Sequence, residues 1–270
     1  MHKKSNKNNK EKAKNKKDNF QQGSRLTKQD WENLARKEPG RLENSSIFCV
    51  QTKTAQKIVV GQEKGPAGFY KFAGKISQMF HGMVGGDPFA EYYLAITYKH
   101  LIMAIEKLEA LREEYEEKIN KMEGMNLVAY TSDKPKGYQI KSKNRYIGLC
   151  VRTILLYDQL ARTLYVGQDL FILKEEEVQE ALRQTRLEIR RALNAPFCWY
   201  YTGVTRYDVR HNTSKAKMAY ESMKITLSSQ ILTGTFKVPL ISVEKMQQIR
   251  EQQKQREAIQ QQEQQQQERD

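Results

Sequence analysis

Apolar side chains recur every three or four residues through most of the central part of this sequence, which is the spacing of one face of an α-helix. Residues 69–84 form one such stripe, bounded on both sides by glycine. Helices are predicted in the same way over residues 54–61, 69–84, 88–122, 145–166 and 174–194, with shorter ones starting near Thr205 and ending before Gly234. The pattern predicts a mainly α-helical fold.

Residues 46–53 follow a different period. Phe48 and Val50 fall on one side of an extended chain, while Cys49, Gln51 and Lys53 fall on the other. This alternation predicts a short β-strand that runs directly into the helix beginning at residue 54. We find no second strand in the pattern, so the backbone groups of this strand are expected to need a partner from elsewhere.

The predicted helix over residues 88–122 carries a heptad seam of about four repeats. Its members are Leu94, Tyr98, Leu101, Ile105, Leu108, Tyr115, Ile119 and Met122, with Arg112 in the one polar step. Two interpretations are open: one helix of an antiparallel bundle within the chain, or a coiled coil between subunits. We favour the bundle, because the helix over 145–166 is apolar nearly all round and belongs in a core that could cover the seam.

Both ends of the chain differ in composition from the middle. Residues 1–24 are rich in lysine and asparagine and predict a disordered basic tail, and residues 241–270 are a Gln-rich low-complexity tail with helix-forming residues. A single helical domain is then expected over 25–240. The formal net charge of +14 indicates a polyanion partner, and nucleic acid fits better than a membrane surface because no strongly amphipathic basic helix is evident.

Catalytic and metal-binding motifs are missing from the sequence. The four histidines are scattered, the three cysteines form no C-x-x-C pair, and no phosphate-binding loop of the G-x-x-x-x-G-K-[ST] kind occurs. The polar run "TRYDVRH" is explained by a helix that starts at Thr205 with an acidic first turn. We therefore expect no enzyme activity, cofactor, metal site or small-molecule substrate. The odd cysteine count and the absence of a membrane-spanning run or secretory signal predict a cytoplasmic protein.

A strand that lacks a partner can pair with the same strand of a second copy. A strand followed by two helices and dimerised in this way is the ribbon-helix-helix arrangement, which residues 46–84 would form in a homodimer. Such a ribbon fits the major groove of double-stranded DNA and reads base edges with its outward side chains. The other interpretation is an ordinary edge strand with Gln51 and Lys53 in water, and the basic tail favours the ribbon.

The ribbon hypothesis assigns roles to particular residues. Gln51 and Lys53 are the candidates for base contacts, with Cys49 as a weaker one. The glycine-rich turn after Gly61 lets the second helix begin with bare backbone N–H groups, which suit a phosphate. The candidates for phosphate contacts are Lys57, the backbone of Gly68, and Lys71.

Several stretches between residues 47 and 234 together resemble one family. They are "FCVQTKTAQKIVVGQ", "GPAGFYKFAGKI", "DPFAEYYL", "LLYDQLARTL", "YTGVTRYDVRHNTSKAKMAYE" and "ILTG", of which "DPFAEYYL" and "TGVTRYDV" are the most specific. In this order they are similar to AcaB-like proteins of conjugative plasmids and integrative conjugative elements. The resemblance implies a cytoplasmic, dimeric, ribbon-helix-helix-type DNA-binding regulator that activates genes of conjugative transfer. Cys49 stands where the family more often has a Thr-like residue.

A second functional class remains open from the sequence. The chain could be a non-catalytic accessory or structural protein of the conjugation apparatus that acts through protein–protein contacts. The heptad helix would then be the interface and the basic tail incidental. Salt-dependent DNA affinity separates the two classes, because a protein-only partner has no DNA binding to lose.

Overall fold

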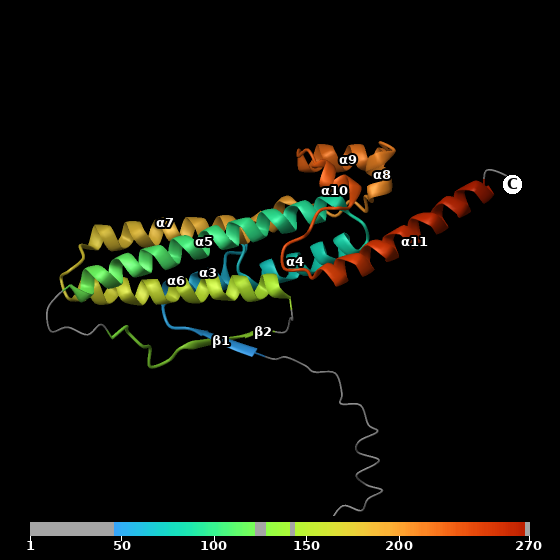
Figure 1. Cartoon of the computed structure of the whole chain (residues 1–270). Coiled ribbons are helices and arrows are strands. Elements are labelled where there is room, and N and C mark those ends of the chain that lie inside the picture. The colour runs from blue at the N-terminus through green and yellow to red at the C-terminus, as the bar shows by residue number, and fades with distance from the viewer. Residues whose placement is uncertain (1–45, 122–127, 141–143, 268–270) are drawn as a thin grey trace, which may run out of the picture. The chain divides into compact units, whose positions relative to one another are not determined.

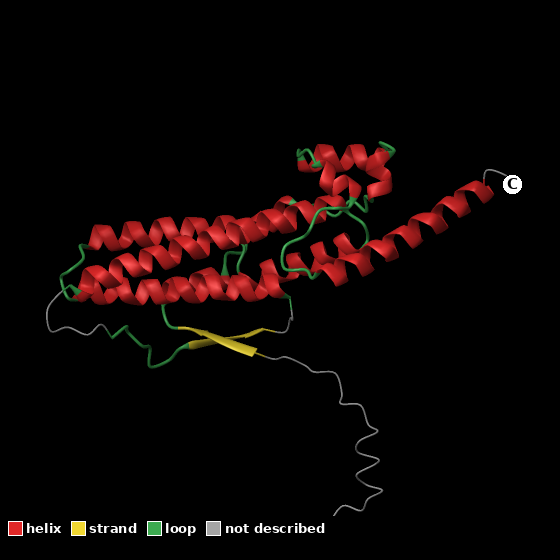
Figure 2. Cartoon of the chain, viewed as in Figure 1, coloured by secondary structure: helices red, strands yellow, loops and turns green. Residues whose placement is uncertain are grey.

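Helices make up most of the chain in the computed structural model, which describes residues 46–121, 128–140 and 144–267 (Figure 2). The prediction of a mainly α-helical fold is confirmed. The expectations for residues 1–24 and for Met122 lie outside the described residues, as does the start of the domain expected over 25–240. Among the residues described, no helix is both long enough and apolar enough to cross a membrane.

The order of elements follows the predicted one closely, with one added strand. The elements are β1 (Ser46–Val50), α3 (Lys53–Val60), α4 (Phe69–Val84), α5 (Pro88–Asn120), β2 (Lys136–Ile140), α6 (Arg145–Asp169), α7 (Glu175–Asn194), a 3-10 turn (Ala195–Cys198), α8 (Arg206–Arg210), α9 (Ser214–Met223), α10 (Ser229–Thr233) and α11 (Val243–Gln267). Both strands belong to one antiparallel two-stranded sheet.

Helices α5, α6 and α7 lie side by side and form the centre of the core (Figure 1). The apolar seam of α5 points into this bundle, where Leu94, Leu101 and Leu108 are fully or almost fully buried. Helix α6 is buried along most of its length, as its all-round apolar pattern predicts. The seam is therefore covered by helices of the same chain, which supports the bundle interpretation over a coiled coil between subunits.

Strand β1 has a partner within the chain, so the prediction of a strand without one is wrong. It pairs with β2 so that Phe48 faces Tyr138 and Cys49 faces Gly137. The rings of Phe48 and Tyr138 lie 5.6 Å apart between centroids, on the side of the sheet that packs on the helices. The sequence pattern over residues 124–144 predicts a loop, which the structure corrects for Lys136–Ile140.

The first turns of α11 belong to the core, although residues 241–270 are predicted from composition to form a tail. Met246, Ile249 and Gln253 of this helix are buried. The guanidinium of Arg250 donates two hydrogen bonds to the carboxylate of Glu91 in α5, at 2.6 and 2.8 Å. The low-complexity composition of this segment does not predict the contact with the core, because only a few residues of α11 make it.

Candidate nucleic-acid interface

The two-stranded ribbon formed by β1 and β2 has one buried face and one face in solvent. Phe48 and Val50 are buried on the inner face, as the alternation predicts. Ile47, Cys49 and Gln139 are exposed on the outer face. Ile47 is 68% exposed, although it is a large apolar residue. The exposed apolar side chain of Ile47 and the exposed amide of Gln139 can together make apolar contacts and hydrogen bonds to another molecule.

Gly137 lies opposite Cys49 on the outer face of the ribbon. A Cβ atom at this position would lie 3.2 Å from Ile47 Cγ2, so Ile47 would have to shift slightly, while its 3.7 Å distance from Cys49 Sγ is an ordinary contact. A residue larger than glycine at this position would therefore crowd Ile47.

Of the three predicted base-contact residues, only Cys49 lies on the outer face of the ribbon. β1 ends at Val50, which takes Gln51 out of the strand period. The side-chain oxygen of Gln51 accepts a hydrogen bond from the backbone N–H of Ser132 at 2.8 Å, and the residue is half-buried. Lys53 is exposed and is the first residue of α3. The structure thus distributes the three over a strand, a connection and a helix.

Asp158 in α6 fixes the junction between the ribbon and α3. Its carboxylate accepts hydrogen bonds from the backbone N–H groups of Gln51 (3.1 Å) and Thr52 (2.8 Å) and from the Thr52 hydroxyl (2.7 Å). The Thr52 hydroxyl oxygen in turn accepts the N–H of Ala55, which caps α3. Asp158 is only 2% exposed. The buried carboxylate therefore binds the backbone at the point where the strand stops and the helix starts.

The turn between α3 and α4 is closed by backbone packing at two glycines. Gly61 has a φ of 69°, in the left-handed region that glycine adopts without strain. Gly68 is buried, and a Cβ there would lie 2.4 Å from the carbonyl oxygen of Val60. Gly68 therefore lets the start of α4 approach the end of α3. The predicted exposure of its backbone to a phosphate is not what the structure has.

Lys71 serves the same turn. Its ammonium group donates hydrogen bonds to the backbone carbonyls of Gln62 at 3.0 Å and of Glu63 at 2.9 Å. The side chain is exposed, so the third ammonium N–H still faces solvent. Among the predicted phosphate contacts, Lys71 therefore has an ammonium group that already binds backbone carbonyls of the turn.

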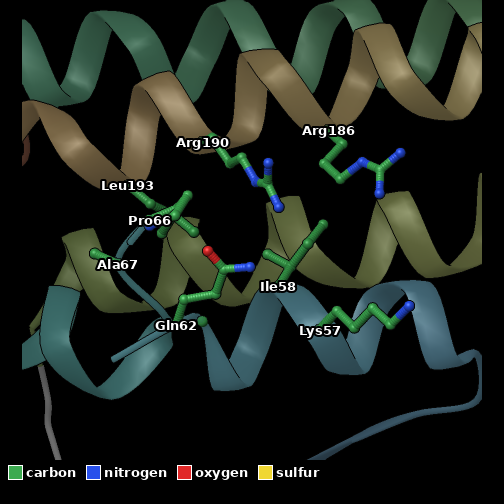
Figure 3. A pocket seen from close by; sticks show the side chains of 9 residues that line it. Lys57, Ile58, Gln62, Pro66, Ala67, Arg186, Arg190 and Leu193 are labelled. Atoms are coloured by element: carbon green, nitrogen blue, oxygen red, sulfur yellow. The ribbon is translucent and has the colours of Figure 1, made fainter. Parts of the chain in front are cut away.

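Lys57 lines a cavity with a strongly basic wall. The cavity, of about 330 Å³, lies between α3, the α3–α4 turn and α7 (Figure 3). We call it the basic pocket. Its charged and polar members are Lys57, Gln62, Arg186 and Arg190, and Ile58 and Leu193 are among its apolar walls. Figure 3 shows the side chains of Arg190 and Gln62 extending toward each other across it.

The cations of the basic pocket lack acidic partners in the described part of the chain. Arg186 and Arg190 are half-buried, one helical turn apart on α7, and neither they nor Lys57 form an ion pair with a described carboxylate. By contrast, Arg183 and Arg191 of the same helix pair with Glu180 and Glu188.

The charge of this pair of arginines reaches the core. Burial raises the pKa of the Tyr157 hydroxyl to about 12, and the nearby charges of Arg186 and Arg190 act in the opposite direction. Both pocket arginines therefore lie close enough to the buried Tyr157 hydroxyl to oppose the effect of its burial.

The model of the family described as "Transcriptional regulator AcaB" matches residues 38–243. The chain belongs to the AcaB family. Among solved structures, it is similar in fold to the crystal structure of selenomethionine-containing AcaB from uropathogenic E. coli, with a TM-score of 0.51 and 12% sequence identity. The similarity covers 71% of this chain and 95% of that one. No curated protein matches the chain.

Membership of the AcaB family makes this protein a transcriptional regulator and confirms the resemblance stated from its sequence. The matched range includes both strands of the ribbon and all three cations of the basic pocket, and it ends where α11 begins. Both candidate surfaces therefore lie in the part of the chain that defines the family match.

Three features of the site are missed by the sequence pattern. Gln139 falls in a segment that reads as a loop, although the alternation in "KGYQI" is a weak strand signal. Asp158 interrupts an otherwise apolar helix, and a carboxylate in such a position usually has buried donors to satisfy. The arginines at the end of residues 174–194 are explained from the sequence by the helix dipole alone. Nothing in their spacing indicates that α3 lies against them.

Proposed function

We propose that this AcaB family member binds double-stranded DNA sequence-specifically through the outer face of its ribbon. The observation that carries the proposal is the ribbon itself: two paired strands whose outward side chains are Ile47, Cys49 and Gln139, with the exposed Lys53 following at the start of α3. A two-stranded β-ribbon has the width that the major groove admits. The regulated genes would be those of conjugative transfer on a mobile element, in the cytoplasm, with the protein as activator.

The outward side chains suit base edges. A glutamine amide can pair with the N6 and N7 positions of adenine, and an apolar side chain such as Ile47 can contact the methyl group of thymine. Lys53 would then contact a phosphate or a base beside the ribbon, and Lys57 and Lys71 would add contacts to phosphates. Gln51 is no longer a base contact in this proposal, because its side-chain oxygen is engaged with Ser132.

We keep a homodimer of the ribbon-helix-helix type in the proposal, but it now rests on the second edge of β1 and not on a strand without a partner. The pairing of β1 with β2 occupies one edge of β1, and no described strand occupies the other. Antiparallel pairing of that edge with β1 of a second copy would join the two copies about a twofold axis. Sedimentation at micromolar concentration tests this: a monomer that does not change with concentration would rule the dimer out.

Footprinting on DNA from upstream of the neighbouring genes, followed by titration of the protected site, tests DNA reading. We expect Gln139→Ala and Lys53→Ala to reduce the preference for that site over random DNA by roughly 1–3 kcal/mol each, with little change in melting temperature. Lys217→Ala is the matched control, because Lys217 is an exposed lysine on α9, away from the ribbon. The proposal would be contradicted if Gln139→Ala and Lys53→Ala both preferred the protected site over random DNA as strongly as Lys217→Ala does.

The basic stretch of residues 1–24 would add affinity that does not depend on sequence. Its lysines are expected to meet phosphates, so removing residues 1–24 should weaken binding to all DNA alike. The slope of log affinity against log salt should become shallower by about 0.9 for each phosphate that the shortened protein no longer neutralises. An unchanged slope would exclude this stretch from the DNA.

The alternative, a non-catalytic accessory protein of the conjugation apparatus, loses its main support. It required the seam of α5 as an interface, and this seam is buried within the chain against α6 and α7. The family description also favours regulation over assembly. Absence of any salt-dependent DNA binding by the full chain would restore it.

A further inference from the structure

We infer that the basic pocket binds one phosphate group, held by Lys57, Arg186 and Arg190. The inference goes beyond the proposed function, because it requires neither the ribbon nor sequence-specific reading. The phosphate could belong to a free phosphorylated compound, as a monoester with close to two negative charges, or to a DNA backbone, as a diester with one. In both cases the pocket would bind the phosphate oxygens.

Positively charged side chains converge on the basic pocket from two elements that are distant in sequence. Lys57 lies in the last turn of α3, while Arg186 and Arg190 lie on one face of α7, and all three line the same cavity (Figure 3). Gln62 adds an amide that can donate a further hydrogen bond.

The positive charge of the basic pocket is not balanced by a described carboxylate. Like charges one turn apart on a helix repel each other, and here both guanidinium groups are half-buried beside apolar walls that include Ile58 and Leu193. Repulsion in such surroundings is screened less than at an open surface. The chain pairs the neighbouring Arg183 with Glu180 but gives the two pocket arginines no described carboxylate. An anion in the pocket would relieve this repulsion.

The donors of the basic pocket suit a phosphate better than a carboxylate. Each guanidinium is a planar fork of N–H donors that matches two oxygens of one phosphate, and a lysine adds a point charge. Two forks and an ammonium group offer more donors and more positive charge than one carboxylate can use. A phosphate monoester, with close to two negative charges and three terminal oxygens, balances them better. The cavity also has room beyond a phosphate for part of an attached group.

A first experiment uses inorganic phosphate as the probe. Thermal melting of the full chain is followed while phosphate replaces chloride at constant ionic strength. We expect phosphate to raise the melting temperature of the wild type and of Arg183→Gln, but not that of the double variant Arg186→Gln/Arg190→Gln. In chloride the double variant should melt no lower than the wild type, because the substitutions relieve repulsion. If the double variant does not fold, the single variant Lys57→Gln replaces it in the experiment, because Lys57 is exposed.

A second experiment separates the two sources of phosphate. If a DNA backbone phosphate occupies the pocket, the double variant should bind random DNA and any footprinted site more weakly by the same factor. Its salt slope should also be shallower than that of Arg183→Gln, by about 0.9 for each DNA phosphate that the pocket no longer binds. If a free phosphorylated compound is the ligand, DNA binding should match that of Arg183→Gln, while the response to inorganic phosphate is abolished.

The inference is overturned if phosphate acts equally on all variants and DNA binding is equal in all of them. That result leaves the ribbon proposal intact, because the wild type would still bind DNA. Conversely, a phosphate response that depends on Arg186 and Arg190, in a protein that binds no DNA, would support the pocket and contradict the proposed function.

Discussion

The carboxylate of Asp158 in α6 accepts the hydroxyl hydrogen bond of Thr52 at 2.7 Å, although 106 positions separate the two residues. Thr52 is at the same time the N-cap of α3. One buried carboxylate therefore connects the core bundle to the point where the ribbon meets its first helix. This contact adds to the packing of Phe48 and Val50 in holding the ribbon on the bundle.

Asp158→Asn should destabilise the fold by about 2 kcal/mol. The amide offers one acceptor oxygen and no charge, while three donors converge on the site, and hydrogen bonds to a charged group contribute about 1.5–3 kcal/mol. Urea denaturation measures the loss. Asp133→Asn is the control, since Asp133 is exposed. A loss no larger than that of the control would mean that the junction is held by packing alone.

Val50→Asp should unfold the ribbon or the whole protein, whereas Cys49→Asp should fold. Val50 is 2% exposed on the inner face, and Cys49 is exposed on the outer one. Burial of a valine contributes about 1.5–3 kcal/mol, and an unpaired buried charge adds a further cost. Thermal melting of the two variants, followed by circular dichroism, checks the strand register. The reverse outcome would place the register one residue away.

Gln51→Ala should cost about 1 kcal/mol of stability, and Lys53→Ala should cost almost none. The Gln51 side-chain oxygen accepts the N–H of Ser132, and its loss leaves that N–H unsatisfied, while Lys53 is exposed. Chemical denaturation distinguishes the two. The sequence pattern alone predicts that substitution of either residue leaves stability unchanged and weakens DNA reading. Equal stability of the two variants would favour that hypothesis.

Stability should fall as pH rises from about 4 to 6, because of Asp87. Burial raises the pKa of this carboxyl from 3.8 to about 6, against the hydrogen bonds it accepts from Trp199 and from two N–H groups of α5. Between these values the folded state binds more protons than the unfolded one, so protonation stabilises the fold and the gain is lost above about pH 6. The change corresponds to about 3 kcal/mol.

Asp87→Asn isolates this contribution, since asparagine also caps helices and does not titrate. We expect the difference in unfolding free energy between wild type and Asp87→Asn to change across pH 4–6 in the stated direction. The exposed control Asp133→Asn should keep the wild-type profile. Parallel profiles for wild type and Asp87→Asn would show that another group determines the pH dependence.

Arg250→Ala should destabilise the protein by about 3 kcal/mol, and Lys254→Ala on the same helix should not. Glu91 is fully buried and pairs with both Arg250 and Arg206. Removal of one partner of a buried ion pair leaves a charge incompletely compensated. Lys254 is exposed and provides the control. Equal thermal melting of the two variants would mean that α11 is not docked through this pair.

The sequence by itself determined the helices and the inner face of β1, because these features depend on local spacing. Helix α6 was recognisable from its all-round apolar residues, and the faces of Phe48 and Val50 followed from the period of an extended chain. Most helix limits followed from nearby glycine and proline. Membership of the AcaB family was also readable from short motifs along the chain.

Only the tertiary structure decided which segments meet. β2 is a five-residue strand far along the chain, and its pairing with β1 depends on how α5 and α6 bring the two together. The same holds for Asp158 beneath Thr52, for Arg250 on Glu91, and for Lys57 beside Arg186 and Arg190. Each contact joins residues whose local sequence is compatible with many neighbours, so its identity comes from packing of the core rather than from local pattern.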